Sequence, residues 1–157
     1  MASLRTLTQD CSKCNLCKNM TISPVAIEMV HWQPKLLVVV GVPVKLDNDL
    51  SQEVISGVDR GLLDKVLSTI GIPYALTFQV KCKSENGQYK KGDYKTCDWV
   101  KKEIEQLSPR FVVGMGKFKY SDIKFDLITE SPARVFVNKK KTDLFKSELE
   151  AIINDFP

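Results

Sequence analysis

Short apolar runs alternate with amphipathic stretches along most of the chain, and this alternation predicts its secondary structure. A continuous, β-branched apolar run that ends in glycine occupies 35–41 (KLLVVVG), which is typical of a strand buried on both faces of a parallel sheet. Similar runs predict strands at 75–80 (ALTFQV) and 110–116 (RFVVGMG). The run at 133–138 (ARVFVN) is the candidate for a fourth strand.

Three stretches place their apolar residues at helical spacing. The first is 61–71 (GLLDKVLSTIG), which has a natural stop at Gly71. The second is 97–107 (CDWVKKEIEQL), with Pro109 just past its end, and the third is 142–154 (TDLFKSELEAIIN). Strands that alternate with helices predict an α/β fold with a mostly parallel sheet, whose ligand sites lie beyond the carboxyl ends of the strands.

The length of 157 residues and the apolar fraction of 43% are those of one globular domain, 1–157. No stretch approaches the roughly 20 apolar residues that a membrane span needs. The first residues (MASLRTLTQD) lack the apolar region of a signal peptide. We therefore expect a cytoplasmic protein without a membrane partner.

Lysines gather in two regions, although the formal net charge of +4 is mild. One group comprises Lys81, Lys83, Lys90, Lys91, Lys95, Lys101 and Lys102, and the other comprises Lys139, Lys140 and Lys141. Each group is either an ordinary solvated surface or a face that contacts phosphates.

Cysteines form a second pattern. Cys11 and Cys14 stand in a C-x2-C turn, and Cys82 and Cys97 flank the lysine-rich stretch 83–96. In a cytoplasmic protein, clustered cysteines favour metal binding over disulfides. Four thiolates suit either zinc or an iron–sulfur cluster, and their spacing does not choose between the two. The alternative is that the five cysteines are unrelated thiols.

The order of these motifs resembles that of a known family. The motifs are CSKCNLC, LLVVVG, RGLLDKVLSTIGIP and TFQVKC, followed by a fourth cysteine before a helix and then by PRFVVGMG. In this order, from about Cys11 to Gly116, they resemble the iron–sulfur (family 4) uracil-DNA glycosylases. One local departure is Arg60, which stands where the family has a glycine.

This resemblance implies a fold and a cofactor. The fold is a three-layer α/β/α sandwich with a central, mostly parallel sheet of four strands. The cofactor is a [4Fe–4S] cluster held by four cysteines, with zinc as the alternative. The implied ligands are Cys11, Cys14, Cys82 and Cys97. Cys17 falls where the family varies, so we treat it as an extra thiol that remains a candidate substitute ligand.

The motifs for base excision are absent. By the resemblance, Val42 stands at the position of a catalytic acid, Ile55 at that of an aromatic residue that stacks on uracil, and Phe78 at that of an amide that reads the base. We therefore expect Phe78 to fill the degenerate base pocket. The family's carboxyl-terminal histidine motif is missing, and the only histidine, His31, is expected to be a packed or surface residue. Trp99 is expected to pack near the cluster.

We conclude at this stage that the chain is a non-catalytic protein of this fold with a structural cluster. It would bind DNA through backbone phosphates, or join a protein of a replication, repair or transcription assembly, and take no small-molecule substrate. The expected DNA contacts are Lys83, Lys90, Lys91, Lys95, Lys139, Lys140 and Lys141. The alternatives are an active DNA glycosylase that uses Asp47 or Asp49, and a protein-interaction module without DNA affinity. Such a short chain would suit a virus or mobile element.

Overall fold

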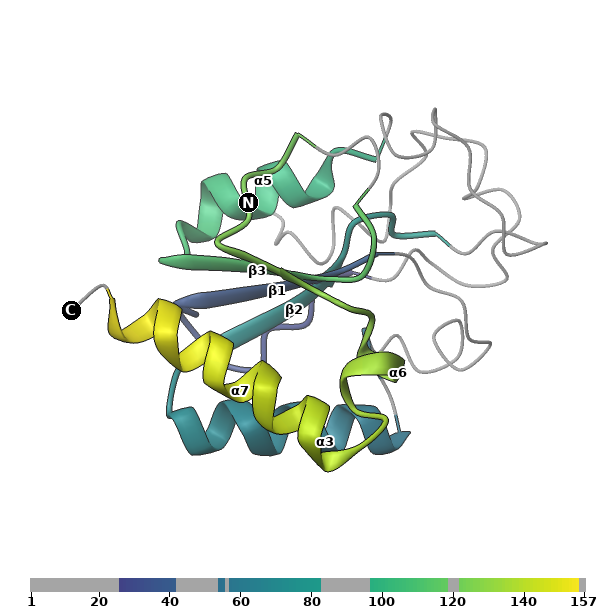
Figure 1. The fold of residues 1–157 in the computed structure, drawn as a ribbon. Coiled ribbons are helices and arrows are strands. Elements are labelled where there is room, and N and C mark those ends of the chain that lie inside the picture. The colour runs from purple at the N-terminus through teal and green to yellow at the C-terminus, as the bar shows by residue number, and fades with distance from the viewer. Residues whose placement is uncertain (1–25, 42–53, 56, 83–96, 119–121, 156–157) are drawn as a thin grey trace.

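A sheet of four parallel strands lies at the centre of the protein, in the order β2-β1-β3-β4 (Figure 1). The computed structural model describes residues 26–41, 54–55, 57–82, 97–118 and 122–155. The strands are β1 (Leu36–Val40), β2 (Tyr74–Phe78), β3 (Phe111–Met115) and β4 (Leu127–Thr129). The helices are α3 (Gly57–Ile70), α5 (Trp99–Leu107), α6 (Pro132–Val135) and α7 (Lys139–Asn154). The prediction of an α/β fold with a parallel sheet is confirmed.

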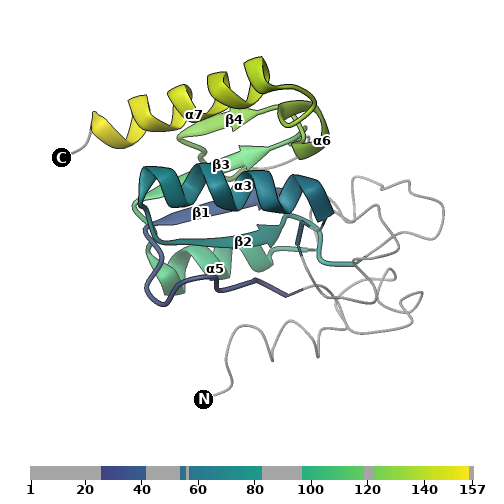
Figure 2. The ribbon, with the colours of Figure 1, turned by 90° about the horizontal axis from the view of Figure 1, so that it is seen from below.

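Helices cover both faces of the sheet, so that the protein has three layers: α5 lies on one face, and α3 and α7 lie on the other (Figure 1, Figure 2). Successive residues of a strand point to opposite faces. Leu36 and Val38 accordingly pack into the core on the side of α3 and α7, whereas Leu37 and Val39 pack on the other side with Val100 of α5. Every residue of β1 is buried, which explains its continuous apolar run.

α3 matches the helix predicted at 61–71 but begins earlier, at Gly57. Leu63 and Leu67 lie on its buried face, as the spacing predicts. Gly71 ends the helix with a φ of +82°, and its N–H donates a hydrogen bond of 2.9 Å to the Leu67 carbonyl. Because this left-handed conformation strains residues with a Cβ, the glycine is a conformational requirement.

The prediction of a fourth strand at 133–138 is wrong, because this run forms α6 and the amino-terminal cap of α7. Pro132 begins α6, at a position where its missing N–H costs no hydrogen bond. The Asn138 side chain caps α7 by accepting a hydrogen bond of 2.9 Å from the Lys141 N–H. The fourth strand is β4, which has 3 residues and is too short to produce a periodic signal.

α7 also begins earlier than predicted and includes the lysines of the second group, Lys139, Lys140 and Lys141, in its first turn. Phe145 and Leu149 bury its apolar face against α6 and the sheet. In the part of the chain that the structure describes, no helix combines the length and the apolar character needed to cross a membrane.

Candidate functional site

Two of the predicted metal ligands, Cys82 and Cys97, lie at the carboxyl end of the sheet, where the chain leaves β2 and later enters α5. Hydrogen bonds prolong the alignment of β2 with β1 beyond Phe78, from the Gln79 N–H to the Val40 carbonyl (2.8 Å) and from the Val80 N–H to the Gly41 carbonyl (3.2 Å). The chain that continues beyond β2 therefore places Cys82 at this end of the sheet.

Cys97 lies at the same end of the sheet. It comes two residues before the start of α5. The Lys81 backbone N–H donates a hydrogen bond to the Cys97 sulfur at 3.4 Å, so this sulfur lies next to the residue that precedes Cys82. The Cys82 side chain is buried and Cys97 is half-buried. The structure thus places the Cys97 sulfur beside the backbone of the residue that precedes Cys82.

The other proposed ligands, Cys11 and Cys14, lie outside the described residues, as does Cys17. Among the residues that the structure describes, no three histidine, cysteine or acidic side chains gather around one point. The two described thiols account for half of the donor set that the resemblance implies.

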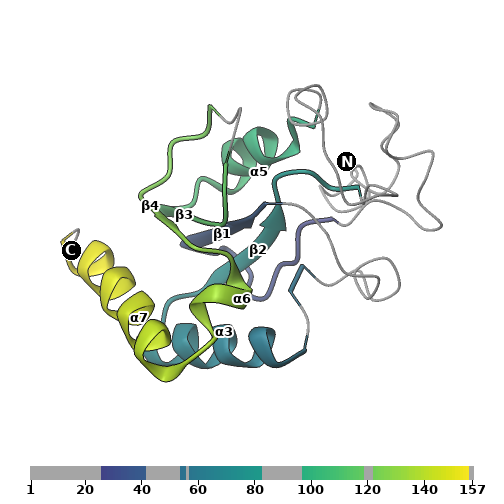
Figure 3. The same cartoon turned by 45° about the vertical axis from the view of Figure 1, so that its right-hand side comes forward.

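Residues 26–31 lead toward the same end of the sheet when they are followed backwards along the chain. This segment runs along the outer side of β2 (Figure 3) and bridges it antiparallel, with hydrogen bonds from the Glu28 N–H to the Leu76 carbonyl (2.7 Å) and from the Leu76 N–H to the Glu28 carbonyl (2.9 Å). Followed backwards from Glu28, the antiparallel chain leads toward the carboxyl end of β2. Fully extended, the stretch between Cys14 and Ala26 spans at most about 40 Å. Of a four-thiolate centre, the described residues supply two thiols, and the centre itself stays a prediction.

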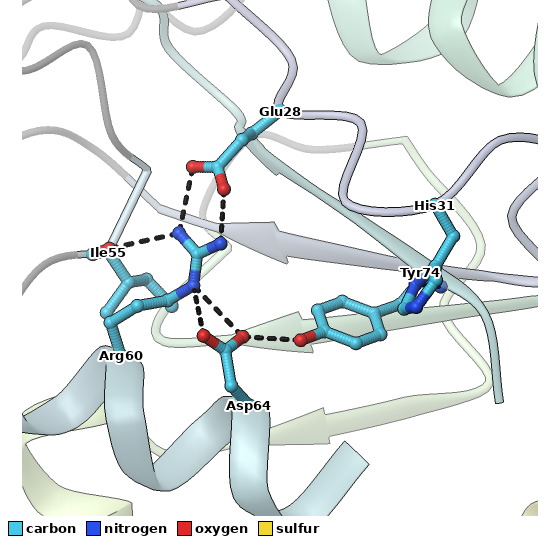
Figure 4. A network of polar contacts seen from close by, with 6 residues as sticks. All are labelled: Glu28, His31, Ile55, Arg60, Asp64 and Tyr74. Carbon is cyan, nitrogen blue, oxygen red and sulfur yellow. Dashed lines mark hydrogen bonds and ion pairs between the residues drawn. The ribbon is translucent and has the colours of Figure 1, made fainter. Parts of the chain in front are cut away.

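Arg60 holds this segment against α3 (Figure 4). Its guanidinium donates to both carboxylate oxygens of Glu28, at 2.8 Å for the longer contact, and its Nε donates to the Asp64 carboxylate at 3.0 Å. It also donates to the Ile55 carbonyl at 3.3 Å. Burial disfavours the charged guanidinium, but the hydrogen bonds to Glu28 and Asp64 outweigh it and raise the pKa of Arg60. Arg60, which the resemblance sets at the position of a glycine, is therefore a structural clamp between residues 26–31 and α3.

Tyr74 links the clamp to His31 (Figure 4). The Tyr74 hydroxyl donates a hydrogen bond to Asp64, and its backbone N–H donates to His31 Nδ1 at 3.2 Å. The two rings meet edge to face, with their centroids 5.1 Å apart. His31 is thus a surface residue packed on a tyrosine, in agreement with its interpretation from the sequence. Burial, together with the hydrogen bond to Asp64, raises the pKa of Tyr74.

We expect this raised pKa to make the protein less stable in alkaline solution. The folded protein holds the Tyr74 proton more tightly than the unfolded chain, so the contribution is complete below about pH 10, the ordinary tyrosine pKa, and is lost as the pH rises toward the folded pKa. Thermal unfolding of the wild type and of Tyr74→Phe should show a difference in Tm that shrinks as the pH rises above about pH 10. A difference that stays constant would contradict the assignment.

The residues expected to form the degenerate base pocket lie partly within the described chain. Phe78 is 2% exposed and Ile55 is 7% exposed, and both belong to the apolar core cluster on the α3 side of the sheet. Val42, together with Asp47 and Asp49 of the alternative enzyme reading, lies outside the described residues. The end of β2 therefore carries an apolar, buried ring at the position to which the resemblance assigns an amide.

Some of the lysines predicted to contact DNA lie within the described residues and others do not. Lys83, Lys90, Lys91 and Lys95 lie outside the described residues. Lys139 and Lys140 are exposed in the first turn of α7, and neither forms an ion pair with a residue that the structure describes. Lys141 pairs with Glu130 at 3.0 Å.

Within the first lysine group, Lys101 pairs with Asp122 on the surface. The Lys102 ammonium lies over the ring of Trp99, 4.7 Å from its centroid. Trp99 itself is buried, at 6% exposure, in the first turn of α5, two residues after Cys97. Its position agrees with the expectation that it packs inside the protein near the predicted cluster ligands.

Lys81 corrects the grouping made from the sequence, because it is 1% exposed and cannot belong to a phosphate-binding surface. Its ammonium forms an ion pair of 2.7 Å with Glu103, which is 0% exposed. The burial of Glu103 has a signal in the sequence, because Glu103 falls between Val100, Ile104 and Leu107 on the apolar face of its helix. A buried acid on that face requires a partner.

No protein-family model matches the chain, and no curated protein matches it by sequence. The resemblance to the iron–sulfur uracil-DNA glycosylases therefore stays a prediction.

Proposed function

We propose that this chain is a non-catalytic relative of the iron–sulfur uracil-DNA glycosylases that carries a structural [4Fe–4S] cluster and binds DNA through its phosphates. One observation carries the proposal: beyond the buried ring of Phe78, the N–H of Lys81, the residue before Cys82, lies 3.4 Å from the Cys97 sulfur. The four-stranded parallel sheet between two helical layers is the arrangement that the resemblance implies, and it supports the proposal.

The apolar end of β2 supports the absence of excision chemistry. An enzyme that removes a base takes it into a pocket and forms hydrogen bonds to its pairing edge. A site built around such bonds rejects an unmatched surface strongly, because buried polar groups would lose their partners. Phe78 supplies a ring without hydrogen-bonding groups and packs in the same core cluster as Ile55. The chain therefore retains the position of the pocket without its chemistry.

The thiols support a structural centre. Cys11, Cys14, Cys82 and Cys97 would occupy all four protein-supplied positions and leave none open to a substrate. When bound, the cluster supplies a rigid link between the amino-terminal segment, the end of β2 and the start of α5. The hydrogen bond from the Lys81 N–H to the Cys97 sulfur is of the kind that stabilises cluster thiolates.

The charges at the start of α7 support phosphate binding. The amino end of α7 lies on the same side of the sheet as the amino end of α3 (Figure 2). The amino end of a helix carries partial positive charge, and α7 places three lysines and no acidic residue in its first turn. Such an arrangement destabilises the helix slightly but favours a bound phosphate. Lys139 and Lys140 are exposed to receive one.

We expect the double variant Lys139→Glu/Lys140→Glu to lose DNA affinity while its Tm stays equal or rises. Losing two phosphate contacts should reduce the slope of log K against log salt by about 2. Acidic residues in the first turn should stabilise α7 by about 0.3–1 kcal/mol each. Titration of labelled single- and double-stranded DNA at several salt concentrations, combined with thermal unfolding, measures both effects.

The matched control is Lys35→Glu/Lys65→Glu, which changes the net charge equally. Lys35 precedes β1 at the opposite end of the sheet, and both control residues are exposed. The control should retain most of the affinity. An equal loss in both double variants, or no DNA affinity in the wild type, would contradict phosphate binding by α7. Release of uracil from DNA by the wild type would contradict the non-catalytic assignment.

A further inference from the structure

A buried ion pair joins the end of β2 to α5. The Lys81 ammonium, inside a side chain that is 1% exposed, donates hydrogen bonds to the Phe78 carbonyl at 2.6 Å, to Glu103 Oε1 at 2.7 Å and to the Thr77 hydroxyl oxygen. The Thr77 hydroxyl contacts both carboxylate oxygens of Glu103, at 2.8 and 3.1 Å. Lys81, Glu103 and Thr77 therefore satisfy one another inside the protein.

Stability alone does not account for such a pair. Taking two charges out of water is costly, and apolar residues of similar volume often stabilise a protein as well or better. Buried polar networks do, however, define one arrangement of the elements they join, because any other arrangement leaves a buried charge without its partner. The position of the Lys81–Glu103 pair therefore indicates what it holds in place.

One end of the pair is next to a predicted metal ligand, and the other lies on the helix that begins just after a second predicted ligand. Lys81 is the residue before Cys82, and its own N–H contacts the Cys97 sulfur at 3.4 Å. Glu103 is one helical turn beyond Trp99, which lies two residues after Cys97. The same side-chain network thus fixes the position of the chain just before Cys82 and the position of α5 just after Cys97.

We propose that Lys81 and Glu103 are positioning residues for the metal centre, which hold the sulfurs of Cys82 and Cys97 at a defined separation before the metal binds. This inference rests on the proposed cofactor. A prearranged pair of thiolates binds metal more tightly and releases it more slowly, because less ordering remains to be done on binding. The pair acts through the backbone of Lys81 and through α5.

The test is the double variant Lys81→Met/Glu103→Leu, which removes both charges and leaves neither partner stranded. Its Tm should stay within about 5 °C of the wild type, since a buried pair replaced by apolar residues costs little. Iron release to a ferrous chelator, followed by the loss of cluster absorption, should be about tenfold faster or more. Glu103→Gln, which keeps the side-chain shape, provides a second test, and its release should also exceed the wild-type rate.

The matched control is Lys101→Met/Asp122→Leu, which removes an ion pair from the same helix. Both of these side chains are more than half exposed, so this variant should release iron at the wild-type rate. Wild-type release rates in the Lys81→Met/Glu103→Leu and Glu103→Gln variants would overturn the positioning role while leaving the cofactor in place. A wild-type protein that binds neither iron nor zinc would overturn the proposed cofactor, and this inference with it.

Discussion

The variants Cys82→Ser and Cys97→Ser should each purify without a stable cluster and should unfold at least about 10 °C below the wild type. A serine hydroxyl is a poor substitute for a thiolate, so the centre loses one of its four ligands. Metal binding to the folded state contributes directly to folding free energy. A loss of about 3 kcal/mol or more corresponds to about 10 °C in a domain of this size. Metal analysis and visible absorption measure the loss of the cluster, and thermal unfolding measures the loss of stability.

The control for these variants is Cys17→Ser, because Cys17 is the thiol outside the proposed ligand set. It should keep the colour and the Tm of the wild type. Coloured, stable Cys82→Ser and Cys97→Ser proteins would show that the ligand assignment is wrong. A colourless Cys17→Ser protein would instead place Cys17 among the ligands.

Placing an amide at the end of β2, where the proposed relatives have one, should damage the protein without creating an enzyme. We expect Phe78→Asn to lose about 4 kcal/mol or more of folding free energy, because it removes a buried ring and places an amide in an apolar cluster. It should show no uracil excision, since Val42 and Ile55 still lack the groups that the chemistry requires. Chemical unfolding and an excision assay on uracil-containing single-stranded DNA give the two readouts.

Phe78→Leu is the matched control, since it keeps an apolar side chain at the same position. It should cost only about 1–2 kcal/mol. If Phe78→Asn were as stable as the wild type, the pocket at this position would be open and polar. If it released uracil, the remaining residues would be catalytic after all, and the proposed function would be wrong.

The elements with strong periodic or continuous apolar patterns were predictable from the sequence. β1 is buried along its whole length and α3 buries one regular face, so each leaves a clear pattern of residues. β4 is short and half-exposed, and the apolar run at 133–138 is shared between a cap and a short helix. Local apolar character does not distinguish a buried turn from a strand in such cases, because packing decides between them.

The candidate site shows the same division. The position of Cys97 near the end of β2 was foreseeable, because Cys82 and Cys97 flank a single stretch between a strand and a helix. The burial of Lys81 was not, since a lysine in a basic sequence resembles a surface residue until its distant partner Glu103 is known. The Arg60 clamp joins three segments in the same way, through contacts that no local pattern reveals.

The most direct test of the account is the iron and acid-labile sulfide content of the wild-type protein purified without oxygen. A [4Fe–4S] centre predicts about four of each per chain and a broad absorption near about 400 nm. Bound zinc without sulfide would retain the four-thiolate site and contradict the cluster. A protein that is colourless and free of both metals, with the fold intact, would contradict the central claim.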